Sequence, residues 1–276
     1  MDGEPVIATL LGTGTSVGVP VIGCSCAVCA SDHPGNRRTR SSLHLKTSGA
    51  SILVDSGPDL RQQALREGLR NIDAVLYTHC HLDHVAGFDE LRAFCWHRED
   101  PLPLFAGPET MATLERMFPW AMSNTSRNYV RPAPRLIAEP FTINDLRVTP
   151  VPVLHSSVET FGFRFDFPTG HSLAYISDVK EVPPASMALL NDLDTLIVDA
   201  LRPSPHPTHM NVEEALALIN RLSPRQSFLT HLAHEFDYRE ASAHLNLPGS
   251  VAVARDGLKL IFEQHHSCAI VLPPGS

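Results

Sequence analysis

Residues 77–87 have the sequence YTHCHLDHVAG, in which three histidines and one aspartate fall within six positions. The four residues are His79, His81, Asp83 and His84. Imidazole nitrogen suits zinc, nickel, iron or manganese, and a carboxylate widens the choice toward harder metals. An apolar run at 74–77 predicts a strand before the motif, and the pattern at 87–91 predicts a helix after it. Because α/β folds place their chemistry where strands end, the motif indicates a metal centre rather than a solvated histidine-rich turn.

Three further candidate ligands each follow an apolar run that predicts a strand. They are His155, Asp178 and His231. Each of them alone could be an ordinary strand-end residue. If the strands end at one edge of the fold, however, the three side chains complete the ligand set of a two-metal site that begins with the motif at 79–84.

With these residues in place, the chain resembles the metallo-β-lactamase-fold hydrolases from Ile7 to about Phe262. The resemblance implies an α/β fold of the αββα type, a sandwich of two mixed sheets with helices outside. It also assigns the ligands: one metal would be held by His79, His81 and His155, the other by Asp83, His84 and His231, with Asp178 as the bridge.

Length and composition agree with a single large domain. The chain has 276 residues, of which 43% are hydrophobic, enough for a full core. We predict one domain over 1–263 and a C-terminal tail over 264–276. The net charge of -8 argues against non-specific binding to nucleic acid or membranes. The chain has no apolar run of membrane-spanning length, and Asp2 and Glu4 make a poor secretory signal, so we expect a cytoplasmic protein.

A second group of metal-ligand residues lies near the N-terminus, where residues 23–29 read GCSCAVC. In a protein expected to be cytoplasmic, this spacing of Cys24, Cys26 and Cys29 favours metal binding over disulfides. A closed tetrahedral zinc site needs a fourth ligand, and His234 is the best candidate because it follows His231 by three residues. The alternative is three reduced cysteines in a turn.

The cysteine cluster narrows the resemblance to the phosphoribosyl cyclic phosphodiesterases of the bacterial carbon–phosphorus lyase pathway. That family combines the H-x-H-x-D-H site with a structural zinc held by three cysteines and a histidine. The stretches that carry the likeness are VTPVPVLHSSVETFGF, LAYISDVKEVPP and SPRQSFLTHLAHEFD. More distant similarity extends to the tRNA 3′-end-processing ribonucleases and to a hydrolase of the pyrroloquinoline quinone pathway. The chain departs from the family in the basic run NRRTR at 36–40 and in its extension from about Glu263 to Ser276.

The resemblance implies hydrolysis of a small, cyclic or nucleotide-like phosphodiester. Two divalent metals (zinc, manganese or nickel) about 3.5–4 Å apart would hold the attacking hydroxide, with Asp83 in the catalytic set as well as among the ligands. Two alternatives stay open: a cofactor-pathway or thioester hydrolase of the same fold, and a nuclease related to the tRNA-processing enzymes. The nuclease alternative lacks support, because those enzymes normally carry a long tRNA-binding arm and the chain has no insertion rich in glycine and basic residues. We expect a homodimer without a stable nucleic-acid partner.

A leaving alkoxide needs a proton, and the segment 205–211 offers two histidines for it. The resemblance aligns His209 with a catalytic histidine of the family, while the spacing leaves His206 as a rival. Asp55, at the end of a predicted strand, either orients a metal-bound histidine or only caps a turn.

The basic run supplies candidate substrate contacts. Arg37, Arg38 and Arg40 would hold a substrate phosphate or else form a solvated loop. After His155, Ser156 and Thr160 are candidate phosphate donors.

Proline spacing predicts an irregular rim loop over 118–135, and apolar periodicity predicts a helix over 212–222. The helix is entered through Asn211, with Glu214 placed for a capping box. A hairpin is expected over 43–54 and a helix over 59–69.

Overall fold

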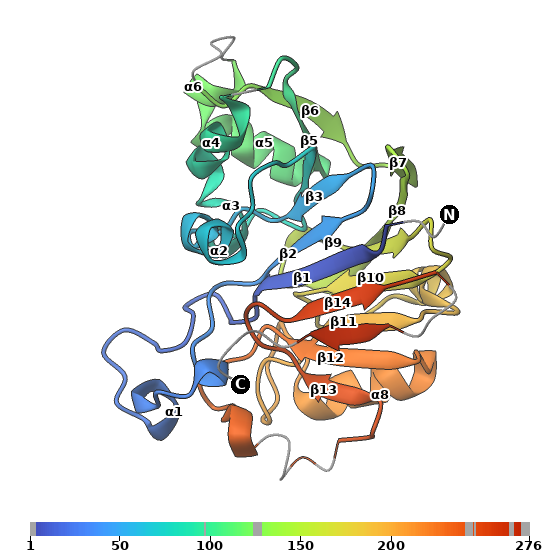
Figure 1. Ribbon diagram of the computed structural model, residues 1–276. Helices are drawn as coiled ribbons and strands as arrows, with labels where there is room; N and C mark the ends of the chain where they lie inside the picture. The colour runs from blue at the N-terminus through green and yellow to red at the C-terminus, as the bar shows by residue number, and fades with distance from the viewer. Residues whose placement is uncertain are drawn as a thin grey trace.

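The computed structural model describes residues 4–96, 98–123, 129–240, 245, 247–264 and 268–271. Within these ranges, two β-sheets lie against each other and helices lie on the outer sides (Figure 1). This confirms the αββα sandwich that the sequence predicts. No helix among the described residues is both long and apolar enough to cross a membrane.

The first sheet has the strand order β15-β14-β1-β2-β3-β4-β5-β6. Its strands are β1 (Val6–Gly12), β2 (Ser42–Lys46), β3 (Ser51–Val54), β4 (Ala74–Leu76), β5 (Leu102–Ala106), β6 (Pro132–Leu136), β14 (Lys259–Phe262) and β15 (Ala269–Val271). The second sheet has the order β13-β12-β11-β10-β9-β8-β7. Its strands are β7 (Phe141–Ile143), β8 (Leu146–His155), β9 (Val158–Asp166), β10 (Ser172–Ile176), β11 (Thr195–Asp199), β12 (Gln226–Thr230) and β13 (Val251–Val253).

Most of the helices are short. The α-helices are α1 (Ala27–Ala30), α2 (Leu60–Glu67), α3 (Leu82–Val85), α4 (Arg92–Cys95), α5 (Pro108–Met117), α6 (Pro119–Met122), α7 (Pro184–Met187) and α8 (Val212–Leu222). The 3₁₀ turns are η1 (Pro34–Asn36), η2 (Phe88–Leu91) and η3 (Ala188–Leu190). Helix α8 begins with the predicted capping box: Asn211 accepts from the Glu214 backbone N–H at 2.8 Å, and the Glu214 carboxylate accepts from the Asn211 N–H at 2.9 Å.

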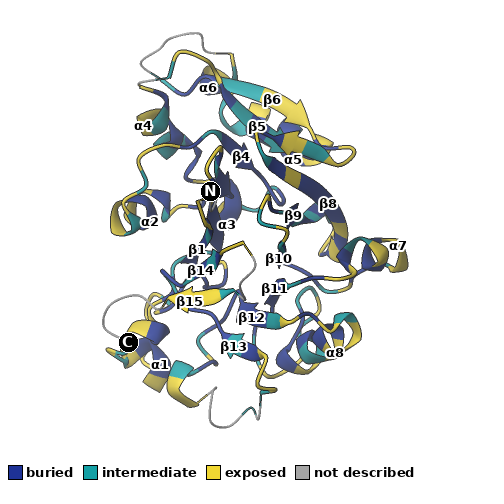
Figure 2. Ribbon diagram, turned by 45° about the vertical axis from the view of Figure 1, so that its right-hand side comes forward, coloured by how far each residue is buried: buried dark blue, intermediate teal, exposed yellow. Residues whose placement is uncertain are grey.

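The apolar side chains form three layers that match the sandwich. One cluster fills the space between the sheets, with Leu43, Phe163 and Ile197 fully buried. A second packs α2 to α6 on the outside of the first sheet, and a third packs α7 and α8 on the outside of the second. Figure 2 shows the resulting dark-blue strands with exposed residues on the helices and turns around them. Burial on this scale makes the sheets a firm support for the loops at their ends.

Strand direction brings the functional loops together. Strands β10, β11 and β12 are parallel, and β8 runs the same way because β9 is antiparallel to both β8 and β10. In the first sheet β3 and β4 are also parallel. The carboxyl ends of these strands therefore open on shared edges of the sandwich, which is where the predicted ligands lie.

Three predictions of local structure need correction. The segment 118–135, predicted to be an irregular rim loop, contains α6 and most of β6. Proline is favourable in the first turn of a helix, where α6 has Pro119, and an edge strand such as β6 tolerates proline. Residues 124–128 lie outside the described ranges. The helical pattern at 87–91 is a 3₁₀ turn, and a helix already begins at Leu82 inside the metal motif. Within the predicted tail, Ala269–Val271 pairs with β14 and so extends the sheet; 265–267 and 272–276 lie outside the described ranges.

Candidate metal centre and active site

The structure brings the seven predicted active-site ligands to one place. His79, His81, Asp83 and His84 follow β4, with Asp83 and His84 in α3. The other three come from the second sheet: His155 is the last residue of β8, Asp178 follows β10, and His231 follows β12. All seven side chains fall into three groups whose ligand atoms lie close together: His79 with His81 and His155, His79 with His84 and Asp178, and Asp83 with Asp178 and His231.

The first group has the convergence that a metal ion needs. His79 Nε2 lies 2.9 Å from His81 Nδ1, which lies 3.3 Å from His155 Nε2. Three imidazole nitrogens this close, with desolvation by burial lowering the pKa of His79 and of His155, suit neutral histidines that share a cation.

The other two groups share Asp178. Its Oδ2 lies 3.2 Å from His84 Nε2, and its Oδ1 lies 3.4 Å from His231 Nε2 and 4.0 Å from His155 Nε2. Asp83 Oδ2 lies 3.1 Å from His84 Nε2. Despite these short distances, His84 Nε2 and Asp178 Oδ2 are buried and neither makes a well-directed hydrogen bond, which is costly unless something else satisfies them. The donor set therefore fits divalent cations, with the two oxygens of Asp178 facing different histidines.

The second ring nitrogen of four histidines is engaged outside the centre. The pairs are His79 Nδ1 with Thr78 Oγ1 at 3.0 Å, His84 Nδ1 with Asp55 Oδ2 at 2.8 Å, His155 Nδ1 with the Thr208 carbonyl at 2.8 Å, and His231 Nδ1 with Ser41 Oγ at 3.2 Å. Such contacts fix the ring orientation and leave Nε2 as the free ligand atom.

Asp55 does more than cap a turn. It is fully buried, accepts from the Thr78 backbone N–H at 2.8 Å, and contacts His84 through its other oxygen. Burial raises the pKa of its carboxyl group, while His84 acts in the opposite direction. The backbone of Asp55 is left-handed at φ 64, as is that of His231 at φ 58, a conformation that non-glycine residues adopt at a cost of order 1–3 kcal/mol. The geometry thus favours the orienting role.

His209 lies beside the predicted metal ligands, whereas His206 lies farther from them. The His209 ring lies 4.5 Å from the His155 ring and 4.8 Å from the His231 ring, centroid to centroid, and its Nδ1 lies 2.7 Å from Asp199 Oδ2. Burial disfavours the charged ring, yet the hydrogen bond with Asp199 and its charge raise the pKa of His209. Burial also raises the pKa of Asp199 to about 7. His206 lies farther out, with its ring 5.2 Å from that of His209 and its Nδ1 engaged by the Thr208 N–H.

The cysteine cluster meets the predicted histidine. His234 Nδ1 lies 3.3 Å from Cys24 Sγ and 3.5 Å from both Cys26 Sγ and Cys29 Sγ. Tetrahedral zinc with ordinary Zn–S and Zn–N bonds requires a sulfur–nitrogen separation of about 3.6 Å. A backbone hydrogen bond from Cys29 lowers the pKa of Cys26 to about 6, which favours the thiolate. The four side chains therefore fit one zinc ion. The other cysteines, Cys80, Cys95 and Cys268, are free.

The structure corrects the prediction for the basic run. Arg38 is 2% exposed, and its guanidinium donates to the carbonyls of Gly35, Ala233 and Phe236. It therefore ties the cysteine loop to the loop that carries His234, and these backbone contacts, rather than a substrate phosphate, occupy its guanidinium group.

The remaining substrate candidates are weaker than the sequence suggests. Arg40 pairs with Asp59 at 3.1 Å, and Arg37 pairs with Asp32 at 3.4 Å. Ser156 is exposed in the turn after β8, whereas Thr160 is buried and donates to the Val158 carbonyl. Arg37, Arg40 and Ser156 stay candidates for substrate contact, with both arginines already paired with a carboxylate.

Sequence reasoning missed three residues that support the centre. Asp199 follows the same pattern as Asp178, a carboxylate at the end of an apolar strand, and this signal could have identified it. Ser41 and the Thr208 carbonyl had no such signal, because one is a common hydroxyl on a loop and the other is backbone.

Comparison with known proteins agrees with this geometry. The family model described as Beta-lactamase superfamily domain matches residues 50–232. The chain belongs to this superfamily. The metal-ligand geometry and this family together favour a metal-dependent hydrolase. A crystal structure described as a new diphosphatase from the PhnP family is similar with a TM-score of 0.86 and 37% identity, over 95% of this chain and 98% of that one.

Two further relatives widen the picture. Zinc-bound PqqB from Methylobacterium extorquens is similar with a TM-score of 0.73 and 25% identity, over 92% of this chain and 99% of that one. An octanoyltransferase of Porphyromonas gingivalis is 34% identical over 263 residues, which are 92% of this chain and 51% of that protein. The chain thus spans about half the length of that curated relative.

Proposed function

We propose that the chain hydrolyses a small phosphodiester at a centre of two divalent metals. The observation that carries the proposal is the placement of His209, backed by the buried Asp199, beside seven metal-ligand side chains. Among the fold's hydrolases, a phosphoryl centre with an alkoxide leaving group has the clearest use for such a proton donor.

The residues divide into distinct tasks. His79, His81 and His155 would hold one cation, Asp83, His84 and His231 would hold the other, and Asp178 would serve both. At these residues, zinc, manganese or nickel would lower the pKa of a water molecule and polarise the phosphoryl oxygen. Asp55 keeps His84 in its ligand orientation. Asp199 holds the Nδ1 side of the His209 ring, so the Nε2 atom on the other side can donate a proton to the leaving oxygen.

A diphosphate bridge is a second candidate bond. It is favoured by the PhnP-family neighbour, a diphosphatase that shares 37% identity with this chain. Both bonds break by displacement at phosphorus, and the same ligand set serves either.

The test is a substrate panel on one metal-analysed sample. The panel holds bis(p-nitrophenyl) phosphate, a 2′,3′-cyclic nucleotide, a dinucleoside diphosphate and an acyl thioester. The proposal predicts turnover of phosphate esters or of the diphosphate, with the thioester at background. Thioester turnover that exceeds every phosphate substrate would contradict it.

A further inference from the structure

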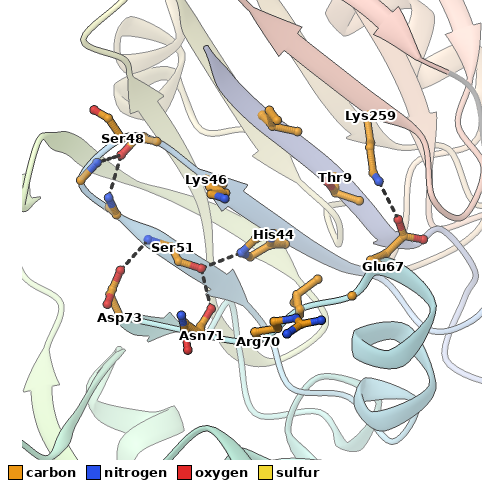
Figure 3. A pocket seen from close by; sticks show the side chains of 16 residues that line it. Thr9, His44, Lys46, Ser48, Ser51, Glu67, Arg70, Asn71, Asp73 and Lys259 are labelled. Carbon is orange, nitrogen blue, oxygen red and sulfur yellow. Dashed lines mark hydrogen bonds and ion pairs between the residues drawn. The ribbon is translucent and has the colours of Figure 1, made fainter. Parts of the chain in front are cut away.

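A cavity lies on the outer face of the first sheet, and none of the predicted metal ligands lines it. Figure 3 shows the side chains that do. It has a volume of about 480 Å³, within the range of about 300–1,000 Å³ that small-molecule sites occupy. Strands β1, β2 and β14 form its floor, and the turn between β2 and β3 and the segment after α2 form its walls.

The floor of the cavity is polar where the outer face of a sheet usually packs on a helix. Thr9 on β1 is paired with His44 on one side and with Lys259 on the other, so these side chains form a row. Lys46 follows His44 by two residues on the same face and is paired with Ser51. Helix α2 ends at Glu67 and leaves this part of the sheet uncovered.

The walls are held in place by hydrogen bonds. At the β2–β3 turn, Thr47 Oγ1 donates to Asp145 at 2.6 Å and Asn144 donates to the Gly49 carbonyl at 2.6 Å. On the other side, the Ser51 N–H donates to Asp73 at 2.8 Å and Ser51 Oγ donates to the Asn71 carbonyl at 2.7 Å. The cavity is therefore formed before any ligand arrives, which lowers the cost of binding.

The charges around the cavity do not cancel locally. Three cationic side chains line it, from Lys46, Arg70 and Lys259, together with two carboxylates, from Glu67 and Asp73. Glu67 is already neutralised by Lys259 at 3.3 Å and by Arg66 at 2.8 Å.

Asp73 accepts from Ser51 and lies 3.8 Å from Arg98. Among the described residues, Lys46 and Arg70 have no acidic partner, so an excess of positive charge faces the cavity.

The lowered pKa of His44 agrees with an excess of positive charge around the cavity. Its Nε2 contacts Ser51 Oγ at 2.8 Å, and because that hydroxyl donates to Asn71, the imidazole is the donor. Burial lowers the pKa of His44 to about 4, and the charges of Lys46 and Lys259 act in the same direction.

We propose that this cavity binds a small phosphate-bearing anion, such as a nucleoside monophosphate, through Lys46 and Arg70. A phosphate dianion matches two uncompensated cations, and the guanidinium fork of arginine suits phosphate oxygens. Strand β3 begins at Ser51 beside the cavity and leads to Asp55 at the metal centre, four residues or roughly 13 Å further on. The site is thus separate from the metal centre, and its ligand is not the substrate being cleaved.

The experiment is calorimetric titration of the metal-loaded protein with AMP at constant ionic strength. The wild type is compared with the double variant Lys46→Ala/Arg70→Ala and with a control, Arg147→Ala/Arg221→Ala, that removes two exposed cations from β8 and α8. The wild type and the control should bind one more equivalent of AMP than the Lys46→Ala/Arg70→Ala variant. If the Lys46→Ala/Arg70→Ala variant still binds AMP at this additional site, the Kd of the site should rise about tenfold or more for each lost contact.

Turnover of bis(p-nitrophenyl) phosphate should be the same in all three proteins, because none of the four residues lies at the metal centre. Adenosine should not bind at this site. Equal AMP binding by the wild type and the Lys46→Ala/Arg70→Ala variant would overturn the proposal. An equal loss of AMP binding in the Arg147→Ala/Arg221→Ala control would show that the effect comes from net charge alone, and this would also overturn the proposal. If citrate bound as tightly as AMP, the assignment of the site to phosphate would be wrong. Failure of the phosphodiesterase proposal would appear in turnover, not in these titrations.

Discussion

Replacing His209 by alanine separates proton donation from metal binding. The His209 side chain is 12% exposed, and among the described residues its hydrogen-bond partner is the buried Asp199, whose Oδ2 lies 2.7 Å from His209 Nδ1. Removing it should therefore take away the acid without opening the seven-ligand set. We expect full metal occupancy and a loss mainly in kcat, of about 10²–10⁴-fold, the usual worth of a positioned acid or base. This corresponds to about 3–5 kcal/mol in the activation free energy.

The assay compares two leaving groups on the same variant. A substrate that releases an alkoxide, such as a 2′,3′-cyclic nucleotide, should show the full loss, because the alkoxide needs a proton. Bis(p-nitrophenyl) phosphate should lose about tenfold or less, since p-nitrophenolate departs unprotonated. The control is His206→Ala, which removes the neighbouring ring 5.2 Å away and should keep near-normal rates with both substrates.

Three outcomes would refute this reasoning. An equal loss with both leaving groups would mean that His209 positions the substrate. Loss of active-site metal would make His209 a ligand, a role that its proximity to His155 and Asp178 allows. No loss in His209→Ala together with a large loss in His206→Ala would transfer the acid to His206.

Four other changes test separate parts of the account. Asp178→Ala should abolish turnover and lower active-site metal content, because it removes the carboxylate that faces both His84 and His231. Metal content and turnover are measured on one sample, and normal values of both would contradict this prediction. Cys26→Ala should release one zinc and lower Tm, and an unchanged zinc stoichiometry would end the Cys3His assignment. Asp55→Ala should weaken metal affinity about 10–100-fold in chelator competition, whereas an unchanged affinity would leave Asp55 a turn cap. His44→Gln should reduce acid sensitivity: the folded pKa of about 4 lies below the unfolded value of 6.5, so neutral His44 stabilises the fold above pH 6.5 and this contribution is lost as pH falls toward 4. Between pH 7 and 5 the wild type should lose roughly 2 kcal/mol more unfolding free energy than the variant, and equal losses in chemical denaturation would contradict the linkage.

The convergence of the candidate metal ligands could be predicted because their pattern is local. The run at 79–84 is short, and His155, Asp178 and His231 each follow an apolar strand, so strand direction alone brings them together. The capping box of α8 was predictable for the same reason, since it depends on two residues three positions apart.

Residues whose role depends on tertiary contacts were harder to predict. Arg38 looks like its basic neighbours in sequence, yet its carbonyl partners at Ala233 and Phe236 lie almost 200 residues away. The contact of Ser41 with His231 likewise spans 190 residues. The strand β15 was missed because an edge strand of three exposed residues has no apolar alternation to reveal it.

The most direct test of the central claim is phosphodiester turnover against active-site metal content, measured on the same preparations. The protein is stripped with a chelator and reloaded stepwise with zinc or manganese, with Cys26→Ala as a matched sample that removes the structural site. The account predicts that hydrolysis of bis(p-nitrophenyl) phosphate is absent in the stripped protein and reaches its maximum at two metals per chain beyond the Cys3His zinc. Full turnover in the stripped protein, or no turnover of any phosphate substrate at two active-site metals per chain, would contradict it.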